Sequence, residues 1–180
     1  MKNVFLLILI LAFPLNDEPQ EETILIVGDS LAFGLSKPMG EIAKRNDVRF
    51  YSDGRGGTTL KQWVEFGWVK KDCQKYEPNT ILVSLGINDY ASPSSREKIS
   101  ERSKHLVNLV GDAEVIWLIP AAKRKSSEYI YEAVKDSGAM IFDARQLDIE
   151  HPKGDIHPTG KGYKAWAKAI WEFIRPPQRH

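Results

Sequence analysis

The sequence predicts an α/β fold in which a five-stranded parallel sheet lies between two layers of helices. Five short apolar runs alternate with segments of helical spacing along the chain, which is typical of βαβ units with right-handed crossovers. The first run, residues 24–27, has four β-favouring apolar residues in succession, which suits a strand buried on both faces. At 180 residues, the chain has the size of one domain with a substantial core.

The five strands are expected at residues 24–27, 48–51, 80–85, 115–119 and 139–142. Glycines follow the first and third strands, and Pro120 ends the fourth. The loop 52–57 after the second strand is too rich in glycine to be regular. This pattern of short strands and short connections predicts a flavodoxin-like three-layer sandwich with helices on both faces of the sheet.

Local signals place the helices. Residues 31–35 are expected to form a tight turn, followed by a short helix with Ser36 before it and Pro38 in its first turn. Capping boxes at Thr59 and Gln62 and at Ser94 and Glu97 predict the start of the next two helices. The first of these is expected to continue towards Trp68. The last two helices are expected at residues 127–137 and 163–174.

Composition and charge exclude several classes of function. The formal net charge of +1 gives no one-signed field for nucleic acid or an anionic membrane. A single cysteine, Cys73, excludes an internal disulfide and a multi-cysteine metal site. The four histidines lack ligand spacing, and the glycines after the first strand match neither a dinucleotide fingerprint nor a phosphate loop. We therefore expect no metal and no cofactor.

The first 20 residues differ from the rest of the chain. Lys2 precedes an apolar run over residues 4–13, and a polar stretch follows Pro14. This pattern is typical of a secretory signal peptide and is too short for a spanning helix, although no clear small-x-small cleavage pair follows. Residues 1–20 are therefore expected to direct export to the periplasm or the medium, or else to remain as an N-terminal membrane anchor. Residues 21–180 are expected to form one domain.

Four short motifs stand at predicted strand ends or just before the last helix: residues 28–30 (Gly-Asp-Ser), 56–59 (Gly-Gly-Thr-Thr), 86–89 (Gly-Ile-Asn-Asp) and 155–158 (Asp-Ile-His-Pro). Ligands of open α/β sheets bind at the carboxyl ends of the strands. The order and context of the motifs resemble the SGNH (GDSL-type) hydrolases over residues 23–174.

The resemblance implies a role for each matching residue. Ser30 would be the nucleophile and His157 the base that takes its proton. The backbone N–H groups of Ser30 and Gly57 and the side-chain amide of Asn88 would form the oxyanion hole. Asp29 and Asp89, which adjoin the motif residues, are interpreted as carboxylates that brace loops.

One position departs from the family pattern. The third triad residue usually stands three residues before the histidine, where this sequence has Gly154, and Asp155 stands two residues before His157. Asp155 is the first candidate for orienting the imidazole. The alternatives are Asp148, Glu150, a backbone carbonyl, or a Ser-His dyad without a third group.

The resemblance implies a metal-independent serine esterase that works through an acyl-enzyme. Short connections leave no obvious lid, so a shallow cleft and small acyl groups such as acetyl on a carbohydrate polymer are expected. A lysophospholipase or thioesterase is an alternative within the same class. Two alternatives from other classes are a non-catalytic carbohydrate-binding module of the same fold and a nucleotide-binding flavodoxin-like domain. Trp63 and Trp68 are interpreted either as core residues or as a sugar-stacking platform.

Overall fold

The computed structural model describes residues 22–89, 93–121 and 125–175. At its centre lies a five-stranded sheet of order β2-β1-β3-β4-β5 in which all neighbouring strands are parallel. The strands are β1 (Thr23–Gly28), β2 (Arg49–Gly54), β3 (Thr80–Ser84), β4 (Glu114–Ile119) and β5 (Met140–Asp143). This order is that of the flavodoxin-like fold, so the predicted architecture is confirmed.

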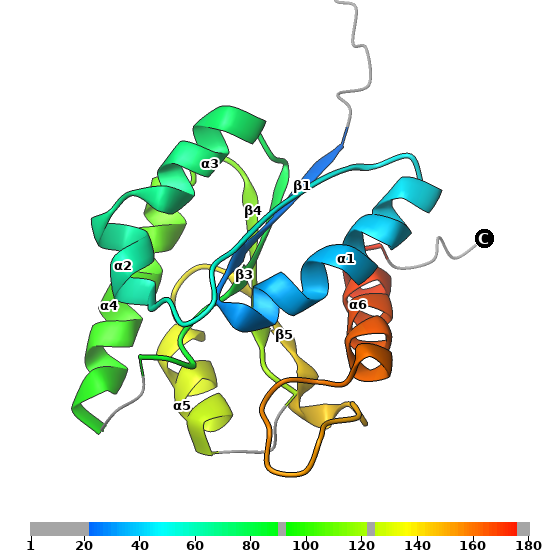
Figure 1. The fold of residues 1–180 in the computed structure, drawn as a ribbon. Helices are drawn as coiled ribbons and strands as arrows, with labels where there is room; N and C mark the ends of the chain where they lie inside the picture. The colour runs from blue at the N-terminus through cyan, green and yellow to red at the C-terminus, as the bar shows by residue number, and fades with distance from the viewer. Residues whose placement is uncertain (1–21, 90–92, 122–124, 176–180) are drawn as a thin grey trace, which may run out of the picture.

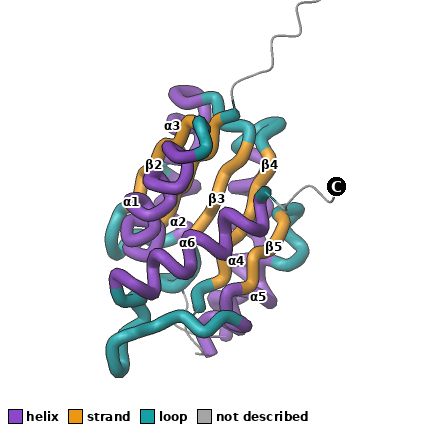
Figure 2. Tube along the Cα trace, turned by 90° about the vertical axis from the view of Figure 1, so that its right-hand side faces the viewer, coloured by secondary structure: helices purple, strands orange, loops and turns teal. Residues whose placement is uncertain are grey.

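Helices cover both faces of the sheet (Figure 1). On one face, α1 (Ser30–Arg45) and α6 (Gly160–Ile174) pack side by side, and Figure 2 shows α6 lying across the front of the strands. The other face carries α2 (Leu60–Glu65), α3 (Trp68–Tyr76), α4 (Pro93–Leu109) and α5 (Lys125–Val134). A short 3₁₀ helix, Ala144–Gln146, follows β5. No helix in the described ranges is long and apolar enough to cross a membrane.

The apolar runs form strands because their side chains are covered on both sides. All residues of β1 and β3 are buried, as are five of the six in β4, and these three strands occupy the middle of the sheet. The edge strands β2 and β5 have mostly half-buried or exposed residues. Trp117 on β4 is fully buried, and its indole N–H donates to the Leu85 carbonyl at 3.2 Å. The core therefore holds the carboxyl ends of β1 and β3 rigidly in place.

The expected tight turn at residues 31–35 is wrong, because helix α1 begins at Ser30. The carboxylate of Asp29 caps this helix by accepting a hydrogen bond from the Leu31 N–H at 2.9 Å. Pro38 therefore lies inside the helix rather than in its first turn. The consequence for the site is that Ser30 is the first residue of a long helix with one buried face.

Two further boundaries differ from the prediction. The capping box of Thr59 and Gln62 is present and starts α2, but α2 ends at Glu65 and a new helix, α3, begins at Trp68. Gly67, at a φ of +63°, makes the break. Helix α4 begins at Pro93, so Ser94 lies within the helix and does not precede it.

Candidate active site

The candidate nucleophile follows β1 at the carboxyl edge of the sheet. Gly28 ends the strand, and a Cβ atom at this position would lie 2.1 Å from the Ser84 carbonyl oxygen of neighbouring β3. The next N–H, from Asp29, donates to that same carbonyl at 3.1 Å. The glycine therefore allows the close approach of two strands that presents half-buried Ser30 at the sheet edge.

Ser30, His157 and Asp155 form a connected hydrogen-bonded group. The Ser30 Oγ lies 2.8 Å from Nε2 of His157, and Nδ1 of the same ring lies 2.8 Å from Oδ1 of Asp155. A carboxylate can only accept, so the contact with Asp155 places the ring hydrogen on Nδ1. Nε2 is then the acceptor that faces the serine hydroxyl.

Asp155 contacts the imidazole although it stands only two residues before it. Gly154, at a φ of +81°, bends the loop, and the Asp155 N–H donates to the Pro152 carbonyl at 3.1 Å. Of the acids left open by the sequence, Asp148 is exposed and Glu150 pairs with Lys161 at 3.7 Å. Asp155 is therefore the carboxylate that the fold brings to the ring.

Hydrogen bonds keep the Asp155 carboxylate ionised. Its Oδ1 accepts from the backbone N–H of His157 at 2.9 Å as well as from the ring. These two bonds lower the pKa of Asp155, the backbone bond contributing most. The side chains of His157 and Asp155 are 42% and 47% exposed, so this part of the site is open to solvent.

The two other candidate oxyanion donors lie on neighbouring loops that are joined to each other. The Asn88 Nδ2 donates to the Thr58 carbonyl at 2.9 Å, and Thr58 follows Gly57 directly. Gly57 has a φ of +73°, where a side chain would be strained although no atom would obstruct it. The Arg55 N–H ties this loop to the Gly28 carbonyl at 2.8 Å, two residues before Ser30.

Two aspartates within the motifs, Asp29 and Asp89, brace the site. Asp89 accepts from the N–H groups of Leu60 and Lys61, at 2.7 and 3.4 Å, at the start of α2. Asp29 caps α1 through Oδ1, while its Oδ2 is buried without a hydrogen-bond partner. Burial raises the pKa of Asp29 to about 7. Both contacts agree with the interpretation of these residues as bracing carboxylates.

Of the two interpretations of Trp63 and Trp68, the structure supports core residues rather than a sugar-stacking platform. Trp63 is fully buried, and its ring meets Trp68 edge-on at 5.5 Å between ring centres. The Arg55 guanidinium covers the half-buried Trp68 at 4.1 Å.

Cys73 is also half-buried, and burial raises the pKa of its thiol to about 11, which makes it a poor nucleophile at neutral pH.

The described residues contain no group of three or more His, Cys, Asp or Glu side chains arranged to hold a metal ion.

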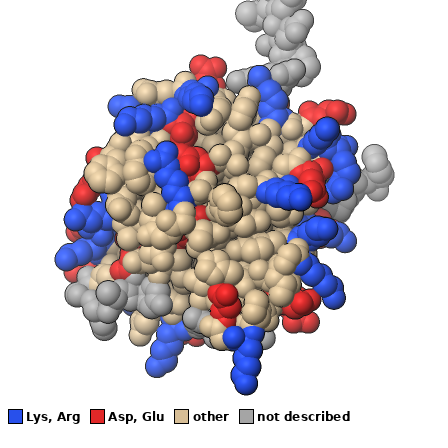
Figure 3. Space-filling view, viewed as in Figure 1, with Lys and Arg blue, Asp and Glu red and all other residues tan. Residues whose placement is uncertain are grey.

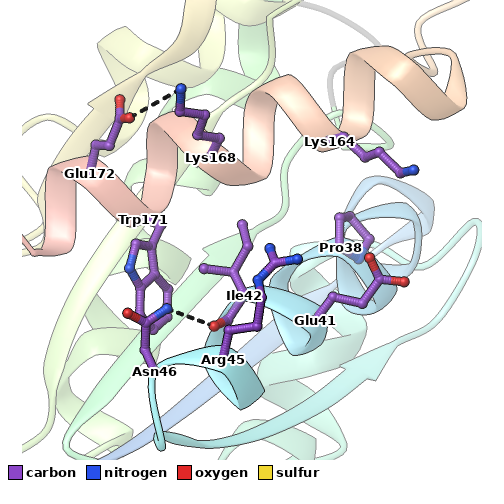
Figure 4. A pocket seen from close by; sticks show the side chains of 9 residues that line it. All are labelled: Pro38, Glu41, Ile42, Arg45, Asn46, Lys164, Lys168, Trp171 and Glu172. Carbon is purple, nitrogen blue, oxygen red and sulfur yellow. Dashed lines mark hydrogen bonds and ion pairs between the residues drawn. The ribbon is translucent and has the colours of Figure 1, made fainter.

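A groove of about 530 Å³ lies between α1 and α6 (Figure 4). It is lined by charged side chains, among them Arg45, Lys164 and Lys168, and by Trp171. None of its lining residues belongs to the four motifs, so this groove is distinct from the group of Ser30, His157 and Asp155.

Sequence reasoning missed two residues that hold the site together. Thr58 and Arg55 stand beside Gly57, and their contacts involve Asn88, Trp63 and the end of β1. The one sequence signal for Thr58 was its place within the second motif, residues 56–59. Its partners are distant in sequence, however, so the role of Thr58 appears only in the fold.

Solved structures of lipases and esterases, and of a G-D-S-L family protein from Desulfitobacterium hafniense, share this fold, as the resemblance to the SGNH (GDSL-type) hydrolases predicts. The structure is similar to the lipase/acylhydrolase from Enterococcus faecalis, with a TM-score of 0.71, 16% identity, and coverage of 88% of this chain and 100% of that chain. Esterase EstA from Pseudoalteromonas sp. gives a TM-score of 0.70 at 19% identity, with 86% of this chain and 97% of that chain covered.

The acetyl xylan esterase AlAXEase gives a TM-score of 0.68 at 15% identity, with 84% of this chain and 99% of that chain covered. Neither protein-family models nor curated protein sequences gave a match. At these identities, the likeness shows that the chain shares the fold of these enzymes.

Proposed function

We propose that this protein is a serine esterase of the SGNH type that hydrolyses acyl esters through an acyl-enzyme. The observation that carries the proposal is the contact of Ser30 Oγ with His157 Nε2 at 2.8 Å, with Asp155 on the other ring nitrogen. A serine hydroxyl is a weak nucleophile at neutral pH, and an imidazole held at this distance is the base that activates it. The fold shared with known esterases supports the same reaction class.

The reaction proceeds in two halves. Ser30 Oγ attacks the ester carbonyl while His157 Nε2 takes the hydroxyl proton, and the bond to the leaving alcohol then breaks as His157 protonates it. The acyl group is now on Ser30. A water molecule attacks this acyl carbon, His157 takes the water proton, and the proton returns to Ser30 as the carboxylic acid leaves. The ionised Asp155 stabilises the imidazolium in both halves.

Negative charge develops on the carbonyl oxygen in each half. The N–H of Ser30 at the start of α1 has no acceptor within the helix and is available to this oxygen. The Gly57 N–H and the second hydrogen of the Asn88 side-chain amide are the other two donors to this oxygen. By comparison with measured oxyanion holes, each donor contributes about 3 kcal/mol to transition-state stabilisation.

A fluorophosphonate probe tests the proposal directly. We expect the wild-type protein to be labelled at Ser30, with loss of labelling and of esterase activity in Ser30→Ala and in His157→Ala. The similar EstA is inhibited by monoethylphosphonate, which makes this probe class suitable. A folded wild-type protein that is neither labelled nor active on any ester would instead favour a binding module.

We further propose that the substrate carries a short acyl group, such as acetyl, on a carbohydrate. The exposure of His157 and Asp155, 42% and 47%, suits a bulky polymer that reaches the site from solvent. The likeness to an acetyl xylan esterase supports this choice. In the view of Figure 3, Lys and Arg are interspersed with Asp and Glu, so this face offers no one-signed surface for a charged polymer.

A series of p-nitrophenyl esters separates this substrate class from its alternative. Activity confined to acetyl, propanoyl and butanoyl esters supports deacetylation. A maximum at octanoyl or longer chains would contradict it and favour a lysophospholipase or thioesterase. Acetate release from acetylated xylan, measured on the same protein, tests the carbohydrate part of the proposal.

A further inference from the structure

Thr58 joins the loop of Gly57 to the loop of Asn88, and its polar groups are fully used. Its carbonyl accepts from Asn88 Nδ2 at 2.9 Å. Its hydroxyl donates to the Arg55 carbonyl at 2.7 Å and accepts from the Trp63 indole N–H at 2.9 Å. These contacts fix the orientation of the Thr58 side chain and of the Thr58 carbonyl, and so also the position of the backbone on either side of Thr58.

On the helix side, the partner of the Thr58 hydroxyl is the indole of Trp63, which is packed in the core. Trp63 is fully buried, and α2, which carries it, starts with the capping box of Thr59 and Gln62. An indole N–H in the core has one direction and needs an acceptor, because an unpaired buried donor costs about 1–3 kcal/mol. The indole N–H of Trp63 thus fixes the position of the Thr58 hydroxyl from the side of the core.

The partner on the strand side is also anchored. The Arg55 guanidinium forms a bidentate pair with Asp53, with N···O distances of 2.9 and 2.5 Å, and stacks over Trp68 at 4.1 Å. This pairing lowers the pKa of Asp53, so its carboxylate remains charged. The carbonyl of Arg55 is therefore a fixed acceptor for the Thr58 hydroxyl.

The contact with Thr58 also determines how Asn88 is used. An asparagine amide has two hydrogens in one plane, and the Thr58 carbonyl takes one of them. The second hydrogen then has a fixed direction. A second tie joins the same two loops, because neighbouring Asp89 accepts from the Leu60 N–H at 2.7 Å.

We propose that Thr58 is the positioning residue of the oxyanion hole, aligning the Gly57 N–H and the Asn88 amide through its two side-chain hydrogen bonds. The kinetic part of this inference rests on the proposed esterase function. Donors that are aligned before the reaction need no reorganisation when charge develops, so they act on the transition state and hardly on the bound substrate. Thr58 itself does not touch the reacting atoms.

The substitution Thr58→Val removes the hydroxyl and keeps the β-branched shape. We expect kcat for p-nitrophenyl acetate to fall at least about tenfold while KM changes less than about twofold, because small misplacements of catalytic groups are costly. The affinity for a trifluoromethyl ketone that mimics the oxyanion should weaken by the same factor as kcat. Thr58→Ser restores the hydroxyl and should recover most of the rate.

Ser103→Ala is the matched control. The Ser103 hydroxyl is buried in α4 and donates to the carbonyl three residues earlier at 2.8 Å, the same bond that Thr58 makes to Arg55. Its loss should lower the melting temperature without changing kcat. An unchanged kcat in folded Thr58→Val, or a loss that Thr58→Ser does not recover, would overturn the inference.

A measurement without turnover separates this inference from the proposed function. In ¹H–¹⁵N spectra, the Asn88 side-chain amide should give two well-separated, slowly exchanging signals in wild type and Thr58→Ser, and averaged or shifted signals in Thr58→Val. If the protein hydrolyses no ester but these signals behave as expected, the esterase proposal fails and the positioning role stands. Identical signals in all three proteins would refute the positioning role.

Discussion

Asp155 is the residue at which the sequence departed most from the expected pattern, and its contact with His157 Nδ1 leads to a sharp prediction. The substitution Asp155→Asn should lower kcat at least about 100-fold with little change in KM, because an amide supports the wrong imidazole tautomer and does not stabilise the imidazolium. Steady-state kinetics on p-nitrophenyl acetate provide the measurement. Asp148→Asn, at an exposed acid of the same loop region, is the control and should leave kcat unchanged.

The buried Asp29 leads to a prediction on stability and pH. Its pKa is raised from 3.8 to about 7 in the folded protein, so between these values the folded state binds more protons than the unfolded state. This group therefore makes the protein less stable as pH rises from about 4 to about 7, with no further change above. His157, Asp89 and Tyr163 are the titratable groups that face Asp29.

Asp29→Asn removes this titration and keeps a good N-cap. The gain in melting temperature over wild type should be small at pH 4 and largest at pH 8. Asp143→Asn is the contrasting control, because Arg145 lowers the pKa of this second N-cap aspartate. Its substitution should cost stability at pH 7 and less at pH 3. A constant offset for Asp29→Asn across this range would show that Asp29 is ionised throughout.

The residues predicted from motifs and those found only in the fold differ in one respect. Ser30 and His157 could be predicted because a local signal marks each of them. Ser30 lies just after the glycine that ends the first strand, and His157 lies in the motif just before the last helix. Thr58 acts through Asn88 and Trp63, which lie 30 and 5 residues away, and neither partner can be assigned without coordinates. Local motifs therefore predict the reacting groups better than the residues that position them.

Among the elements, α1 and α6 matter most, because α1 begins with Ser30 and α6 begins three residues after His157. Their contact depends on Gly34, where a Cβ atom would lie 2.1 Å from the ring of Tyr163. Gly34→Ala should displace the Tyr163 ring from between the helices, lower the free energy of unfolding by about 1–3 kcal/mol and reduce kcat by disturbing the Ser30–His157 contact. Chemical denaturation and kinetics on the same sample test both effects.

Gly40→Ala in the same helix is the matched control. A Cβ atom there would meet Phe50 at 3.4 Å, which is an acceptable contact, and alanine favours helices over glycine by about 1 kcal/mol. This variant should be at least as stable as wild type with unchanged kcat. Equal destabilisation by the two substitutions would mean that Tyr163 yields easily and that Gly34 is not needed for packing.

The same glycine explains an error at the scale of elements. Gly34 and Pro38 look like turn residues in the sequence, but Gly34 serves helix packing and Pro38 is accommodated inside α1. Helix α3 was also missed, because it has only nine residues and Val69 is its one buried residue. The Thr59–Gln62 capping box was predicted correctly because its contacts are local.

For the whole molecule, the alternation of apolar strands and helices was sufficient to predict the parallel sheet and its two helical layers. The central strands β1, β3 and β4 have continuous apolar runs because the sheet is covered on both faces. The groove between α1 and α6 in Figure 4 could not be predicted, since it depends on how closely two helices pack along their length. The periodicity of apolar residues thus predicts the sheet and helix layers, whereas grooves between helices depend on how the side chains pack.

The start of the described fold at Glu22 leads to the last prediction, on the export proposed for residues 1–20. Residues 1–20 lie outside the described residues, whereas Glu22, just before β1, pairs with Arg175 at the end of α6. A protein starting at residue 21 keeps this pair and every described element, so it should match the full chain in melting temperature and in kcat.

Cell fractionation of the full-length protein then distinguishes cleavage from anchoring. If residues 1–20 are a signal peptide, the exported protein should appear in the soluble fraction with the mass of residues 21–180 or close to it, because every described helix and strand lies within those residues. Recovery in the membrane fraction at full mass would instead identify an N-terminal anchor, and a full-mass soluble protein inside the cell would exclude export altogether. Since the apolar run over residues 4–13 is short for a spanning helix, we expect the first outcome.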